Sequence, residues 1–205
     1  MRMARYVERF NTAERVLHWF VAASFFTLLL SGLGLYSLLF HHTFDLFGGG
    51  EGAILVHKIA GVIFFFSSLL LFFNHAREVV SFDESDRKWF RALGGYLSKD
   101  PEHIDSGKFN AGQKVFGLFM GIATLLLGVT GVINWWPQSF PRVIVQLSLL
   151  LHGLLFIAFV MLMVVHVYLT TIGNPGTLEG MLYGNVRRIW ARKHHPKWYK
   201  EIAGK

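Results

Sequence analysis

The stretch that decides the fold begins at Val143, ends at Ile172 and reads VIVQLSLLLHGLLFIAFVMLMVVHVYLTTI. Its thirty residues contain no Asp, Glu, Lys or Arg, and about 20 helical residues are enough to cross the hydrocarbon core of a bilayer. In lipid every backbone polar group must be paired within the segment, so this stretch must be a helix. It also carries two histidines, His152 and His166, at depths where an ionisable side chain is costly and usually marks a function.

Three further apolar runs lie outward along the chain, at residues 16–40, 53–73 and 115–133. The composition fits a protein largely embedded in lipid, since 53% of the 205 residues are hydrophobic and 16% are charged. The sequence therefore predicts an all-α integral membrane protein. We expect one domain over residues 1–205, in which a bundle of four transmembrane helices, at about 16–40, 53–73, 115–133 and 143–172, precedes a basic tail at 173–205.

Lys and Arg are distributed unevenly about the four runs. Eighteen of them lie before the first run, between the second and third runs, or after the fourth run, and two lie on the opposite side. Cytoplasmic segments of membrane proteins carry the excess of Lys and Arg. We therefore expect a multi-pass protein of the bacterial cytoplasmic (inner) membrane with both termini in the cytoplasm. This pattern accounts for the net charge of +7, so no nucleic-acid partner is expected.

The chain has no cysteine and ten histidines. The absence of cysteine excludes disulfides, iron–sulfur clusters, thiolate-bound zinc and covalently attached c-type haem. Any metal must therefore be held by histidine or carboxylate. Four histidines lie inside the apolar runs, namely His18, His57, His152 and His166.

These four histidines fall at two depths in the predicted bundle. His57 and His152 lie near the outer ends of their helices, whereas His18 and His166 lie near the cytoplasmic ends. Two histidines at one depth on different helices are what a b-type haem with two axial imidazoles requires. The pairs His57–His152 and His18–His166 therefore predict a dihaem cytochrome b, although each histidine taken singly could equally serve helix packing.

Small residues near these histidines would let a flat macrocycle approach the backbone, and ordinary helix packing uses the same residues. The candidates are Gly32, Gly34, Gly61, Gly117, Gly121, Gly128, Gly131 and Gly153. The six other histidines are expected on the solvated surface, with a metal site as a weaker alternative: His41, His42, His75, His103, His194 and His195. The basic run at 187–193 is expected either as an interfacial helix on anionic lipid or as an orientation signal and docking surface.

Nearly the whole chain resembles the cytochrome b (gamma) subunit of membrane-bound respiratory formate dehydrogenases. The Asn-x-Gly-Gln-Lys run and the Lys-His-His-Pro-x-Trp-Tyr tail are the specific features in combination. The residues that carry the resemblance are Ala13-Glu14-Arg15, His18-Trp19, Ser31-Gly32-Leu33-Gly34, His57, the run from Phe109 to Lys114, His152, His166 and the tail from Trp190 to Tyr199.

The resemblance implies a subunit that is not an enzyme on its own. It would anchor an iron–sulfur (beta) subunit and a molybdenum- or tungsten-pterin catalytic (alpha) subunit at the outer face of the membrane. Electrons from formate would pass through the outer and inner haem b to menaquinone or ubiquinone, which is reduced near the cytoplasmic side. The resemblance places the quinone at Asn110, Gly112 and Gln113, beside the inner ligand His166; a helix N-cap explains Asn110 equally well, and both roles can coexist.

Two passages depart from the family pattern, and two other functions remain open. Trp135-Trp136-Pro137 stands where the family has Trp-Arg-Pro, and residues 172–176 form a longer, turn-like passage. The first alternative is the cytochrome b subunit of a membrane-bound nickel–iron hydrogenase or of a related molybdoenzyme. The second is a haem-free membrane anchor or transporter with buried packing histidines.

Overall fold

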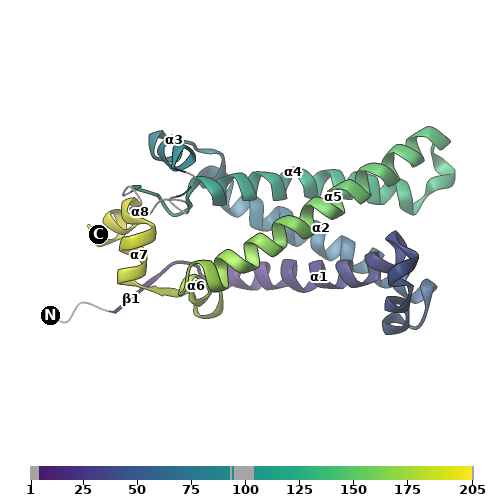
Figure 1. Cartoon of the computed structure of the whole chain (residues 1–205), viewed down its shortest axis with the longest axis horizontal. Coiled ribbons are helices and arrows are strands. Elements are labelled where there is room, and N and C mark those ends of the chain that lie inside the picture. Colours follow the sequence, from purple (N-terminus) through teal and green to yellow (C-terminus); the bar gives the residue numbers. More distant parts are fainter. Residues whose placement is uncertain (1–4, 93, 95–103, 205) are drawn as a thin grey trace. The chain divides into compact units, whose positions relative to one another are not determined.

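The computed structural model describes residues 5–92, 94 and 104–204. Long helices dominate this part of the chain (Figure 1). In chain order the elements are β1 Tyr6–Glu8, α1 Thr12–Tyr36, the 3-10 helix Leu38–Phe47, α2 Gly50–Val80, α3 Glu84–Arg91, α4 Ala111–Trp135, the 3-10 turn Pro137–Ser139, α5 Arg142–Tyr168, the π-helical turn Leu169–Gly173, α6 Thr177–Tyr183, β2 Asn185–Arg187, α7 Arg188–His194 and α8 Pro196–Ala203.

Within the described residues, four helices, α1, α2, α4 and the α5 segment, are long and apolar enough to cross a membrane. The predicted all-α membrane fold is therefore confirmed. Every helix differs from its apolar run by one to seven residues at its ends. The first helix ends at Tyr36 because Ser37 adopts an extended backbone and its side chain accepts a hydrogen bond from Leu39 N. The second helix continues seven residues beyond its apolar run, to Val80, because polar side chains do not interrupt the backbone hydrogen bonds of a helix.

The chain divides into two compact units. The span unit consists of Val16–Leu71 and Gly121–His166, and the terminal unit consists of Met1–Arg15, Phe72–Met120 and Val167–Lys205. The expectation of a single domain over residues 1–205 stays a prediction.

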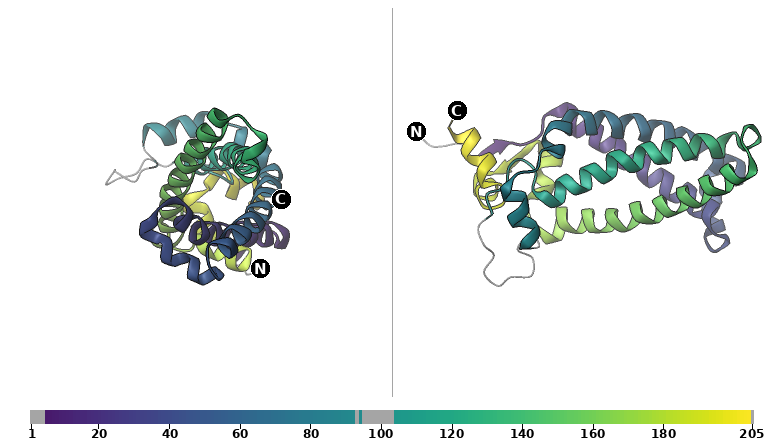
Figure 2. Two further views of the ribbon diagram at one scale, coloured as in Figure 1. Left: turned by 90° about the vertical axis from the view of Figure 1, so that its right-hand side faces the viewer. Right: turned by 90° about the horizontal axis from the view of Figure 1, so that it is seen from above.

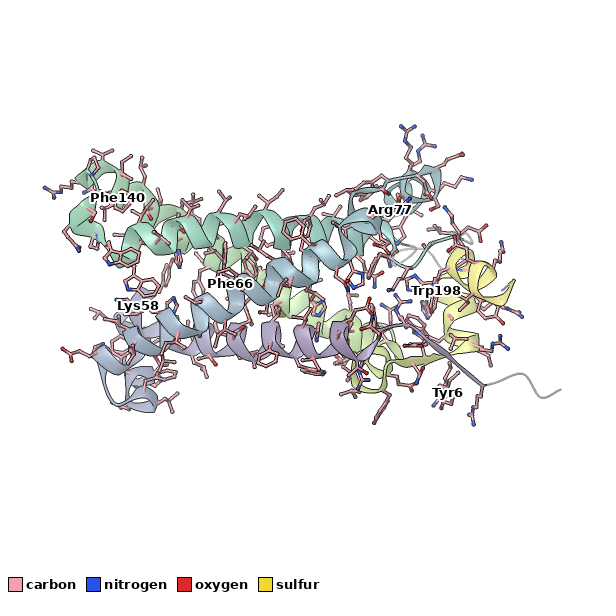
Figure 3. The ribbon with its side chains drawn as sticks, turned by 180° about the vertical axis from the view of Figure 1, so that it is seen from behind. Tyr6, Lys58, Phe66, Arg77, Phe140 and Trp198 are labelled. Carbon is pink, nitrogen blue, oxygen red and sulfur yellow. The ribbon has the colours of Figure 1, made fainter. Side chains whose placement is uncertain are left out.

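In the span unit, the middle parts of the four long helices run side by side (Figure 2). Aromatic rings fill its centre: Phe159 of α5 lies with its ring centroid 6.3 Å from that of Phe25 and 5.7 Å from that of Phe64. Outward-facing residues are also apolar, as at Phe66, which is labelled in Figure 3 and is 59% exposed. Apolar residues inside and outside are typical of a bundle that faces lipid.

In the terminal unit, a two-stranded antiparallel sheet joins the two ends of the described chain. Val7 of β1 pairs with Val186 of β2. Against this sheet pack α7 and α8, and Trp198, labelled in Figure 3, belongs to the same small core. Gly184 precedes β2 with a φ of +81°, and a Cβ at this position would lie 2.8 Å from Phe10 O, so the turn into the sheet requires glycine. Sequence patterns did not predict this sheet, because its strands are three residues long.

Candidate functional site

His57 of α2 is held by a hydroxyl on the neighbouring helix α1. Its Nδ1 lies 2.9 Å from Ser31 Oγ, and that hydroxyl donates its hydrogen to Thr27 O at 2.7 Å. Because the single hydroxyl hydrogen is already used, Ser31 Oγ accepts from Nδ1–H of the imidazole. The carbonyl of Leu28 is a further acceptor for the same ring. This arrangement leaves the lone pair of His57 Nε2 for a metal ion.

His152 of α5 is held in the same way by α4. Its Nδ1 lies 2.8 Å from Thr130 Oγ1, which donates to Leu126 O at 2.8 Å. The proton therefore again belongs on Nδ1, and the lone pair of Nε2 remains for ligation. Metal-ligating histidines usually donate their second nitrogen to a fixed acceptor, which sets the orientation of the ring. His57 and His152 also lie within electrostatic reach of each other.

Each of these hydroxyl residues is followed by a glycine that lies beside the imidazole. A Cβ on Gly32 would lie 3.1 Å from His57 Cε1, which is a tight contact, whereas a Cβ on Gly131 would lie 3.8 Å from His152 Cε1, which is an ordinary one. Gly32 therefore makes room for His57, whereas the space beside His152 does not require glycine. Other candidate glycines serve helix packing instead: a Cβ on Gly128 would lie 2.4 Å from the ring of Phe65.

In the second predicted pair, the rings of His18 of α1 and His166 of α5 lie close together. Their ring centroids are 6.3 Å apart, and their planes are inclined at 40°. A metal ion at about 2 Å from a nitrogen of each ring would fit a separation of this kind. His18 Nδ1 is buried and has no hydrogen-bond partner within the described part of the chain. Buried polar atoms normally have partners, so this orphaned nitrogen fits a site completed by a bound group.

The residues predicted to bind quinone open α4. Asn110 Oδ1 accepts from Gln113 N–H at 2.9 Å, while Gln113 Oε1 accepts from Asn110 N–H at 3.0 Å. This reciprocal capping box confirms the N-cap interpretation of Asn110. Because the capping box uses both side-chain carbonyl oxygens, each carboxamide offers its NH₂ group to a ligand.

Gly112, the third of these residues, lies against a tryptophan that sequence analysis did not single out. A Cβ on Gly112 would lie 2.6 Å from Cη2 of Trp89 in α3. The buried Lys114 fastens α3 to α4, because its Nζ donates to Asp86 at 2.6 Å and to Ser81 O at 2.7 Å. Asn110, Gly112 and Gln113 thus share the terminal unit with Trp89, whereas His166 is the last residue of the span unit. The predicted neighbourhood of His166 to the quinone residues stays a prediction.

Comparison with known proteins supports the haem interpretation. Residues 9–184 match the family described as prokaryotic cytochrome b561. This chain belongs to the prokaryotic cytochrome b561 family. Family membership implies that the cytochrome binds haem b and, with its four apolar helices, that it is a bacterial membrane protein.

Three curated relatives match the cytochrome over nearly its whole length. The nitrate-inducible formate dehydrogenase cytochrome b556(Fdn) subunit of Escherichia coli K12 is 34% identical over 98% of this chain and 94% of its own length. The formate dehydrogenase cytochrome b556(fdo) subunit of the same strain is 31% identical over 96% and 93%. The formate dehydrogenase cytochrome b556 subunit of Haemophilus influenzae is 29% identical over 94% and 82%.

The C-terminal tail of the cytochrome forms hydrogen bonds with the segment that leads to Asn110. His195 Nδ1 donates to Gly107 O at 2.7 Å, and Lys197 N donates to Ser106 O at 3.2 Å. Arg9 Nη2 donates to Lys108 O at 2.8 Å and lies 3.1 Å from His195 Nε2. Three consecutive carbonyls are therefore held by the tail and by Arg9.

Burial shifts the pKa values of His195 and Arg9. Burial and the neighbouring Arg9 guanidinium hold the pKa of His195 well below its usual value, so the ring is neutral and Nε2 accepts from Arg9. Burial also lowers the pKa of Arg9 to about 9. The guanidinium carbon of Arg9 lies 4.8 Å from the ring centroid of Trp190 and 5.2 Å from that of Trp198. These aromatic faces stabilise the buried cation.

A second buried group joins Glu14, His75 and Lys108. Glu14 Oε1 lies 3.2 Å from His75 Nε2 and 3.3 Å from Lys108 Nζ. Glu14 Oε2 accepts from Asn11 N–H at 2.6 Å, and Asn11 Oδ1 accepts from Glu14 N–H at 2.9 Å. These reciprocal hydrogen bonds form a capping box at the start of α1.

The surface assignment was wrong for two of the six remaining histidines. His75 and His195 are buried, at 8% and 2% exposure. Each is held by residues more than sixty positions away in sequence, so no local pattern marks its burial. His41 and His42 are exposed as predicted, His194 is half-buried, and His103 lies outside the described residues.

Proposed function

We propose that this cytochrome is the membrane-anchor and electron-transfer subunit of a respiratory formate dehydrogenase. The matched pair of hydroxyl-held histidines, His57 and His152, is the observation that carries the proposal, because it prepares two ligands for a haem iron. The formate dehydrogenase cytochrome subunits among its relatives supply the enzyme context.

The proposed ligand pairs are His57 with His152 and His18 with His166. When bound, two haem b groups supply one-electron carriers at two depths of the membrane. Ser31 and Thr130 orient the first pair and raise the basicity of its ligating nitrogens by accepting from Nδ1–H.

The proposed quinone site uses Asn110, Gly112, Gln113 and His166. The carboxamide NH₂ groups of Asn110 and Gln113 are suitable donors to a quinone carbonyl oxygen, because the capping box occupies their carbonyl ends. The aromatic face of Trp89 beside Gly112 offers an apolar wall for a quinone ring. Menaquinone and ubiquinone both have the carbonyl groups that this chemistry recognises.

The proposed partners are an iron–sulfur subunit and a molybdenum- or tungsten-pterin catalytic subunit on the outer face of the inner membrane. The cytochrome has no cysteine, so electrons from formate must reach it through clusters held by another chain. The excess of Lys and Arg before α1, between α2 and α4, and after α5 supports a cytoplasmic location of both termini and of the quinone site.

The test is to purify the complex through a tag on this chain and record its absorption spectrum. We expect two b-type haems per cytochrome, reduced by formate and reoxidised by a quinone analogue. We also expect the pterin-containing formate dehydrogenase subunit to co-purify. A haem-free protein would overturn the electron-transfer role, and a co-purifying hydrogenase subunit would overturn the choice of enzyme.

A further inference from the structure

Three ionisable side chains meet in the terminal unit without a place in the function described above. Glu14 comes from the first turn of α1, His75 from the last turns of α2, and Lys108 from the segment before α4. One carboxylate oxygen, Glu14 Oε1, contacts both His75 Nε2 and Lys108 Nζ. We propose that Lys108, Glu14 and His75 form a relay that takes up protons for quinone reduction, an inference that rests on the proposed function.

The burial of the three side chains gives the relay a direction. The Lys108 side chain is 22% exposed, whereas those of Glu14 and His75 are 8% and 10% exposed. Lys108 is therefore the member that meets water, and the other two carry the path inward. Continuous hydrogen-bond contacts of this kind are what proton transfer between side chains requires.

The inner end of the relay lies beside the segment that carries the proposed quinone residues. The His75 ring is 5.1 Å from that of Phe109 and 6.2 Å from that of Phe10, measured between centroids. Phe109 immediately precedes Asn110. The two phenylalanines enclose the imidazole in an apolar setting, so protons reach it through Glu14 and not directly from bulk water.

A structural ion pair alone does not account for this arrangement. The N-cap of α1 needs only Glu14 Oε2, which accepts from Asn11 N–H. Burying a further carboxylate oxygen with an imidazole is costly, and apolar side chains of similar volume often stabilise a protein as well or better. A group that must gain and lose protons explains why titratable residues occupy this position.

The proposed relay supplies the protons that quinone reduction consumes. Reduction of one quinone consumes two electrons, which originate from formate, and two protons, which convert both carbonyl oxygens into hydroxyls. For each proton, the Lys108 ammonium donates to Glu14 Oε1 and is reprotonated by water. Glu14 then donates to His75 Nε2, and His75 releases a proton from Nδ1 toward the quinone side. A ring flip then restores the starting tautomer before the second proton passes.

The test uses the variants Glu14→Gln and His75→Gln of the intact complex in inside-out vesicles, with formate enclosed in the lumen, where the catalytic subunit lies. Both variants should keep the spectra of the haems and their rate of reduction by formate. Reoxidation of the haems by quinone should slow at least about tenfold and show a solvent deuterium isotope effect. Proton uptake at the exposed cytoplasmic face, followed with a pH indicator, should slow in parallel. Glu14→Asp keeps an ionisable carboxyl group and should restore part of both rates.

Glu84→Gln is the matched control, because Glu84 is an exposed carboxylate of the same unit whose side chain is 84% exposed. It should leave every rate unchanged. Wild-type reoxidation and proton uptake in both relay variants would overturn the relay while leaving the quinone site intact, since Gln113→Leu tests that site separately. If Glu14→Gln lowers the haem content, His75→Gln decides the question by the same measurements.

Discussion

His195 donates from Nδ1 to Gly107 O over 88 positions of sequence, at a distance of 2.7 Å. This bond links the tail to the segment that ends in the capping residue Asn110. Because the donor ring is 2% exposed, the linkage is shielded from water. The tail motif thus has a physical role: it fixes the backbone that leads to the proposed quinone residues.

Loss of the His195 donor should loosen this segment. In His195→Ala the buried Gly107 carbonyl loses its partner, which costs about 1–3 kcal/mol. His195→Asn places an amide donor near the position of Nδ1 and should retain more protection. Amide hydrogen exchange over residues 104–110 measures the difference. Because the folded pKa of His195 is lowered, protons bind preferentially to the loosened state as pH falls below about 6.5. Protection should therefore weaken from pH 7.5 to 5.5 in the wild type and stay constant in His195→Asn.

The four spans could be predicted because uninterrupted apolar length is a local property of the sequence. The depths of the four histidines could also be predicted from the local sequence, and the structure brings His18 close to His166. The hydroxyl partners illustrate the limit of such reasoning. Ser31 and Thr130 act across helices, and their signal, a Ser or Thr followed by Gly in two different helices, has meaning only when the helices are paired.

The terminal unit was less predictable for the same reason. Its buried charges are stabilised by partners from distant segments, as Glu14 is by His75 and Lys108. Sequence patterns classify such residues as solvated, because ionisable side chains are rarely buried without partners. The capping boxes at Asn11 and Asn110 were predictable, since their partners lie three residues away.

Removal of one proposed axial ligand should remove one haem. In His57→Ala the site shared with His152 loses a ligand, so the haem content of the purified complex should fall from two per cytochrome to one. His18→Ala should likewise leave the other haem. Quantitative absorption spectra of the reduced proteins check both variants. Retention of both haems in His57→Ala would show that the pairing is wrong.

Removal of the hydroxyl acceptor should change the tuning of a haem without expelling it. Ser31→Ala deletes the acceptor of His57 Nδ1–H, so the imidazole becomes less basic toward iron. The midpoint potential of one haem should rise, because a weaker donor stabilises the oxidised iron less. Spectroscopic redox titration measures this shift. Ser24→Ala is the control, since its hydroxyl bonds only to carbonyls of its own helix among the described residues; equal titrations of both variants would argue against the hydroxyl's role.

Loss of the Gln113 carboxamide should affect quinone and not haem. Gln113→Leu removes a donor to the quinone carbonyl and leaves the histidines of the proposed haem sites unchanged. Both haems should keep their absorption bands and their reduction by formate, while reoxidation by a quinone analogue should slow at least about tenfold. Because the capping box is also broken, Gln113→Glu provides the comparison: it retains the cap acceptor but not the NH₂ donor, and should be equally slow. Fast reoxidation in Gln113→Glu would reduce the role of Gln113 to capping.

The proposed topology makes turnover electrogenic. If formate is oxidised outside and quinone is reduced at the cytoplasmic side, each electron moves inward against a potential that costs about 2.3 kcal/mol per 100 mV. Protons are released outside and consumed inside, so the same charge separation also appears as a proton gradient. In sealed right-side-out vesicles, formate with a quinone analogue should therefore generate a potential that is negative inside, reported by a voltage-sensitive dye. An uncoupler should abolish the potential and leave turnover running. Turnover without a potential in tight vesicles would place quinone reduction on the outer side and contradict the assignment of Asn110, Gly112 and Gln113.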